Sequence, residues 1–101
     1  MATNKDPLGS ISDEIELLER HISILKTVRE NQPIGLIRLS EMTNIPKHRV
    51  RYSLKLLEQQ GIIIPTTDGA TVSDRCDDFL EGISTHIDDI AEKIDSLRSK
   101  L

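Results

Sequence analysis

Aromatic residues, cysteine and long apolar runs are all scarce in this chain of 101 residues. Only Tyr52 and Phe79 are aromatic, so any core must be aliphatic, and 14 isoleucines, 12 leucines and 3 valines can supply it. No run of about 18 apolar residues occurs, which predicts that no segment spans a membrane. The N-terminus MATNKDPLGS lacks the apolar stretch of a secretory signal, and the single cysteine, Cys76, excludes an internal disulfide. Both features predict a cytoplasmic protein, because free thiols persist in a reducing compartment.

The chain also lacks the residue groupings that catalysis or metal binding would need. Its histidines and its cysteine are too dispersed for a zinc site, which uses closely spaced pairs. The five glycines occur singly, so no phosphate-binding loop is present. Adjacent carboxylates fall in helical patterns, where neighbouring residues do not face each other. We therefore expect a binding protein that is not an enzyme and that uses no metal or cofactor.

Patterning divides the chain into three segments. Residues 1–10 are polar and contain a proline and a glycine, which predicts a disordered leader. Residues 11–73 contain helical patterns followed by a hairpin pattern, and residues 74–101 follow one long helical pattern. The expected fold class is therefore mainly α with one small β-hairpin.

The first helix is expected over residues 12–31, with Ser12 as its N-cap. Pro33 ends it, because a proline disfavours helical geometry in the residue before it. Apolar residues recur every three or four positions along one face, as an amphipathic helix requires: Ile11, Ile15, Leu18, Ile22, Leu25 and Val28.

Residues 35–60 have the pattern of two helices joined by a tight turn. Asn44 tolerates the left-handed backbone that such a turn demands. The second of these helices, over 46–60, has an apolar face made of Val50, Leu54 and Leu57, and Gly61 is a natural stop. Two short β-branched runs flank an Asp-Gly turn and predict a hairpin over 62–73.

The order of these elements resembles the winged helix-turn-helix family. The resemblance covers residues 33–73 and rests on LSEMTNIPKHRV for the helix-turn-helix, LKLLEQQGIII for the recognition helix and first wing strand, and TTDGA for the wing tip. The phrase KHRVRYSLKLLEQQGII is similar to archaeal members. The chain departs from the family at Asn44, where glycine is common, and at Pro46, where serine or threonine often caps the helix. The resemblance implies a small transcriptional regulator that binds DNA.

Cations are concentrated on the expected recognition helix. The whole chain carries a net charge of −4, whereas no acidic residue lies between Lys47 and Lys55. DNA affinity depends on local neutralisation of phosphates, so this helix is the expected contact. A helical wheel assigns base reading to His48, Arg49 and Tyr52 and phosphate binding to Lys47, Arg51 and Lys55. The wing has no cation, so we expect its contacts to be slight.

The segment 74–101 carries a strict heptad pattern. Its apolar residues are spaced 3, 4, 3, 4, 3, 4, and Cys76 extends the pattern backward: Leu80, Ile83, Ile87, Ile90, Ile94, Leu97 and Leu101. A monomer rarely exposes such a stripe, so we predict a symmetric homodimer. Its interface would use these residues through Leu97, together with Ile15, Leu18 and Ile22 of the first helix, and would bury Cys76.

Flanking charges bear on how the helices pair. In a parallel pair of C-terminal helices, Lys93 would face Arg98 of the partner subunit and repel it. Opposite charges match if the N- and C-terminal helices run antiparallel, with Lys26 near Asp77 or Glu81. The sequence leaves open whether the N-terminal helix packs on the C-terminal helix of its own chain or of the partner.

The sequence therefore predicts a sequence-specific DNA-binding transcriptional regulator that acts as a homodimer. The alternative is a winged-helix protein-interaction or assembly module that docks through its heptad helix.

Overall fold

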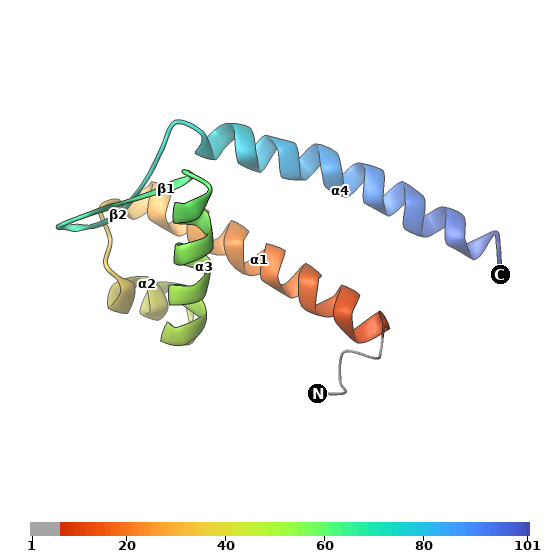
Figure 1. Cartoon of the computed structure of the whole chain (residues 1–101), viewed down its shortest axis with the longest axis horizontal. Helices are drawn as coiled ribbons and strands as arrows, with labels where there is room; N and C mark the ends of the chain where they lie inside the picture. The colour runs from red at the N-terminus through yellow and green to blue at the C-terminus, as the bar shows by residue number, and fades with distance from the viewer. Residues whose placement is uncertain (1–6) are drawn as a thin grey trace.

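The structure, a computed structural model, describes residues 7–101 and is mainly helical with one two-stranded hairpin (Figure 1). This is the predicted fold class. The elements follow in the order α1 (Pro7–Asn31), α2 (Leu36–Thr43), α3 (Lys47–Gln59), β1 (Ile63–Thr66), β2 (Gly69–Val72) and α4 (Cys76–Arg98).

The N-terminal prediction was wrong in part. Residues 7–10 belong to α1 rather than to a disordered leader, and Ser12 lies inside the helix instead of capping it. The remainder of the predicted leader lies outside the described residues. A proline fits the first turn of a helix, because the backbone N–H that it lacks has no intrahelical partner there.

The core is aliphatic and joins every element. Its buried residues are Ile24, Leu25, Val28, Ile34, Leu39, Val50, Leu57, Ile62, Ile63, Ala70 and Cys76. Ile24 is fully buried although it lies off the stripe predicted for the first helix, whereas Ile11 and Ile15 of that stripe are exposed. The apolar surface of α1 therefore divides: its C-terminal half enters the core, and its N-terminal half does not.

The turn between α2 and α3 fixes the start of α3. Asn44 adopts the left-handed conformation, with φ 57°, as the sequence predicts. Pro46 precedes α3 without a side-chain cap, and its carbonyl oxygen accepts the N–H groups of Arg49 and Val50. The hydroxyl of Ser40 donates to the carbonyl oxygen of Ile45 and ties α2 to the turn.

The hairpin is attached to the helices by backbone pairing. Its strands run antiparallel, with Ile63 opposite Val72 and Thr66 opposite Gly69. Ile34 and Ala70 exchange two backbone hydrogen bonds of 3.1 and 2.8 Å, which join β2 to the segment before α2. Gly69 has φ 131°, and a Cβ there would lie 2.6–2.8 Å from the backbone of Ile34, so only glycine fits.

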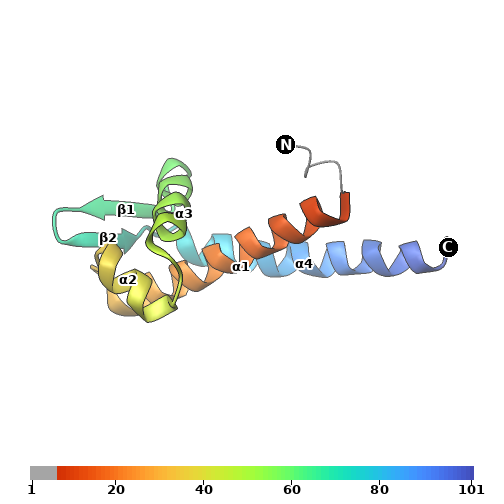
Figure 2. The same cartoon turned by 90° about the horizontal axis from the view of Figure 1, so that it is seen from below.

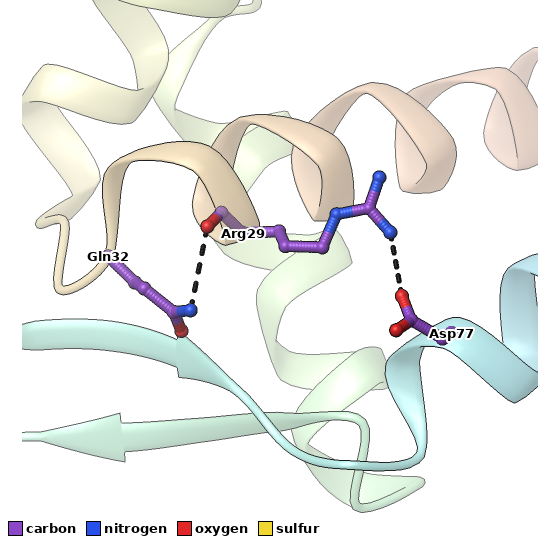
Figure 3. A network of polar contacts seen from close by, with 3 residues as sticks. All are labelled: Arg29, Gln32 and Asp77. Carbon is purple, nitrogen blue, oxygen red and sulfur yellow. Dashed lines mark hydrogen bonds and ion pairs between the residues drawn. The ribbon is translucent and has the colours of Figure 1, made fainter.

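The helices α1 and α4 run antiparallel and diverge toward the N-terminus of α1 (Figures 1 and 2). We call this pair the α1–α4 fork. At its closed end an Arg29 nitrogen lies 2.7 Å from a carboxylate oxygen of Asp77. Gln32 donates to the carbonyl oxygen of Arg29 (Figure 3) and accepts the N–H of Val72. The Arg29–Asp77 pair joins the end of α1 to the start of α4, and the Gln32 bonds join the end of α1 to β2.

Cys76 is placed differently from the prediction. It is 1% exposed and packs in the core of its own chain, not in an interface between chains. Burial raises the pKa of its thiol, which lowers the thiolate fraction and makes the sulfur less reactive. The helix itself is also shorter than the predicted segment 74–101, since it ends at Arg98.

The burial of Ile24 yields a stability prediction. Ile24→Ala should lower the free energy of unfolding by about 2–5 kcal/mol, because it leaves a cavity in the core. The matched control Ile37→Ala lies on α2 at 59% exposure and should change it by less than about 0.5 kcal/mol. Urea denaturation followed by circular dichroism measures both, and equal effects would contradict the core described above.

His21 makes stability depend on pH. Burial, and then the charge of Arg20, lower the pKa of His21 below its ordinary value of 6.5. The unfolded state then binds protons more readily, so the free energy of unfolding should fall as pH drops from about 7.5 to about 5.5. His21→Gln should flatten this dependence, whereas His86→Gln, at an exposed position, should leave it in place. Urea titrations at each pH provide the measurement.

Candidate nucleic-acid interface

The outward face of α3 carries all six residues predicted to contact DNA. Val50, Ser53 and Leu57 are buried on the inner face of the helix. This orientation leaves the six side chains exposed: Lys47, His48, Arg49, Arg51, Tyr52 and Lys55. None of them takes part in an ion pair within residues 7–101, where the pairs are Arg29–Asp77 and Lys93–Asp89.

The structure divides these six residues into two groups. His48, Arg49 and Tyr52 line a groove between α3 and the N-terminal half of α1, which contributes Asp13, Glu16 and Arg20. A second groove adjoins the first one at the turn between α2 and α3. Lys47, Arg51 and Lys55 line neither groove. The predicted base-reading residues are thus together on the side of α3 that faces α1.

Acidic side chains of α1 lie beside this group. Glu16 lines both grooves, and Glu19 lines the second one with Arg49 and the turn between α2 and α3. These carboxylates were not predicted from the sequence, because the residue pattern of α3 does not show which face of α1 lies next to it. The spacing of Asp13, Glu16 and Arg20 on one helical face is the signal that was available.

The hairpin tip presents hydroxyls and a carboxylate rather than cations. Thr66 donates its hydroxyl hydrogen to the carbonyl oxygen of Gly69, and its oxygen accepts the N–H of Asp68. These bonds close the turn, and Thr67 and Asp68 are exposed. The tip therefore offers little attraction to phosphate.

The residues predicted for dimerisation lie along the α1–α4 fork. Ile22 lines a groove with Leu80, Ile83 and Ile87, and Leu18 lines a neighbouring one with Phe79, Gly82 and Ile83. Within one chain, therefore, side chains of α1 and of its own α4 border the same grooves near the closed end. Toward the open end the side chains are exposed, at fractions of 57% for Ile15, 44% for Ile87, 38% for Ile90, 49% for Ile94 and 55% for Leu97.

Within residues 7–101, no three His, Cys, Asp or Glu side chains are grouped so that they could hold a metal ion. Nor does this part of the chain contain a helix long and apolar enough to cross a membrane.

Comparison with known proteins identifies the domain. Residues 17–64 match the family model described as winged helix-turn-helix DNA-binding. This part of the chain belongs to that family. In the terms of the winged helix-turn-helix, α2 and α3 form the helix-turn-helix, α3 is the recognition helix, and the hairpin is the wing. The match includes α3 completely and stops within β1, so β2 and α4 lie beyond it.

A solved structure has a similar fold. The activation domain of the phage T4 transcription factor MotA is 17% identical, with a TM-score of 0.56 over 73% of this chain and 80% of that chain. At this identity the likeness is one of fold. No curated protein sequence matches the chain.

Proposed function

We propose that the protein is a transcriptional regulator that binds specific DNA sequences as a homodimer, without catalysing a reaction. The observation that carries this proposal is the exposed, unpaired cationic face of the recognition helix on a chain whose net charge is −4. Because the rest of the chain repels phosphate, binding would depend on this one face. A regulator of this kind acts in the cytoplasm, where the DNA of a prokaryotic cell lies.

The two groups of residues on α3 would have different roles. His48, Arg49 and Tyr52 lie in the N-terminal half of the helix, the part that reaches base edges in this docking mode. Arginine can bind guanine through two hydrogen bonds, so Arg49 is the main candidate for base reading. Lys47, Arg51 and Lys55 would bind phosphates and hold the helix in the major groove.

The carboxylates of α1 fit this division. Glu16 and Glu19 line a groove with Arg49, so their negative charges would oppose the approach of phosphates to it. A non-specific duplex offers Arg49 no base contact in compensation, so the acidic groove would weaken non-specific binding more than specific binding. The acidic groove would thereby increase the preference for a specific site and lower the overall affinity for DNA.

Surface area supports a homodimer. The chain exposes 7397 Å², compared with about 5,800 Å² for a compact monomer of its mass. Its radius of gyration is 15.7 Å, compared with about 13 Å for a compact domain of this length. The exposed isoleucines and leucines of the α1–α4 fork are the surface that a second copy would cover.

A protein-interaction module is the second candidate. The acidic groove beside α3 and the cation-free wing favour it, and the similar fold named above is the activation domain of a transcription factor. Salt dependence separates the two candidates, since only a DNA complex releases condensed counterions on binding.

Removal of the two arginines that flank Val50 tests DNA binding. Arg49→Ala with Arg51→Ala should weaken binding to duplex DNA at least about tenfold and reduce the salt slope, because a base contact and a phosphate contact are lost. The control Arg49→Lys with Arg51→Lys keeps both charges and should retain the salt slope of the unaltered protein. Fluorescence anisotropy across a salt series measures both, and binding that ignores salt would favour the interaction module.

Charge placed on the exposed stripe of α4 tests dimerisation. Ile90→Asp with Ile94→Asp should convert the dimer to a monomer, because carboxylates would be buried in an apolar interface. The control Thr85→Asp with Ser99→Asp adds the same charge at exposed positions off the stripe and should remain dimeric. Sedimentation velocity gives the mass of each, and a monomeric unaltered protein at micromolar concentration would contradict the proposal.

A further inference from the structure

We propose that the two copies pair their α4 helices antiparallel, in a register that sets Leu80 against the partner's Leu97, Ile83 against the partner's Ile94 and Ile87 against the partner's Ile90. The inference rests on the proposed homodimer and specifies how its interface is built. The occupant of the exposed face of α4 is thus the same face of a second copy.

The spacing of the stripe permits this register without a gap. From Leu80 to Leu97 the intervals are 3, 4, 3, 4 and 3, a series that is the same in both directions. Reversal of one helix therefore places an apolar residue opposite every apolar residue. A parallel pair would also match its residues, so spacing alone does not determine the direction.

The distribution of charge along α4 determines the direction. Within α4, residues 76–89 contain five carboxylates and no lysine or arginine, a net charge of −5, whereas residues 90–98 contain two cations and two carboxylates, a net charge of 0. A parallel pair would set the two strongly acidic halves side by side. An antiparallel pair sets each acidic half beside the partner's neutral half, which holds both cations of the helix, and it also opposes the two helix dipoles.

The flanking side chains give the same result. In a parallel pair Lys93 would lie beside Arg98 of the partner subunit, and two cations would repel. In the antiparallel register Arg98 lies beside the partner's Asp77, which the described chain already pairs with Arg29. Arg98 of one chain would thus add a second cation to the Arg29–Asp77 ion pair of the other chain.

The shape of the fork provides room for the partner helix. Exposure along α4 rises from half-buried Leu80 and Ile83 at the closed end to 55% at Leu97 near the open end. Gly82 lines an almost wholly apolar groove with Leu18 and Phe79, and no atom lies within 4 Å of the position of a Cβ on it. The C-terminal half of the partner's α4 would fill this space, and the two forks would interlock as a four-helix bundle.

Cysteines introduced one at a time into the full chain, which keeps its buried Cys76, test the direction of pairing. Ile94→Cys alone should give no disulfide-linked dimer on mild oxidation, because the two sulfurs would lie about 16 Å apart along an antiparallel pair. Tagged Ile83→Cys mixed with Ile94→Cys should give a linked dimer that contains one chain of each. Leu97→Cys, at an exposed position, repeats the first test, and the unaltered chain controls for the buried Cys76.

Each result is decisive. A linked mixed dimer with no self-linked Ile94→Cys or Leu97→Cys supports the antiparallel register. Self-linked Ile94→Cys or Leu97→Cys would overturn it in favour of a parallel pair. A dimer by sedimentation in which the mixed cysteines stay unlinked would also overturn it, without favouring a parallel pair. DNA binding is measured separately by anisotropy. If the predicted disulfides form but the protein does not bind DNA, the proposed function fails and this inference stands. If the protein binds DNA but the predicted disulfides do not form, only this inference fails.

Discussion

Aliphatic packing between the C-terminal half of α1 and the inner face of α3 determines what the recognition helix leaves exposed. Ile24, Leu25 and Val28 form one core with Val50 and Leu57, and α1 contacts α3 directly. Because the apolar face of α3 is occupied in this way, its cations must point outward. The same packing places the N-terminal half of α1 next to the start of α3. The position of the acidic groove is thus a consequence of the core.

Charge is distributed so that attraction and repulsion lie close together. An acidic chain keeps one cationic face, and carboxylates of α1 border that face on one side. Such an arrangement lowers the general affinity for polyanions. A regulator benefits from this, because a genome contains many competing non-specific sites. The heptad helix shows a second separation of charge, from its acidic first half to its neutral second half. Under the proposed function, the charges on and beside α3 determine which DNA is bound. The charges along α4 determine the direction in which the helices of two chains pair.

Local sequence signals predicted the helix-turn-helix part of the molecule well. Asn44 and Gly61 place the ends of α3 at Lys47 and Gln59, within a residue of the predicted range, since each needs a backbone that few other residues adopt. Ile24 and Cys76 were misjudged for a different reason: an amphipathic pattern shows that a face is apolar but not what covers it. The pairing of Arg29 with Asp77 joins residues 48 positions apart. The sequence suggested that opposite charges meet there, but it favoured Lys26, because the rotation of one helix against another depends on packing.

The central claim is that two recognition helices, related by a two-fold axis, bind DNA through their exposed cations. Selection of bound duplexes from a random DNA pool tests it most directly, because one experiment reports affinity, symmetry and spacing. The account predicts enrichment of an inverted repeat, with half-sites about 34–36 Å or a multiple of that distance apart. Enrichment of a single asymmetric site, or no enrichment at low salt, would contradict it.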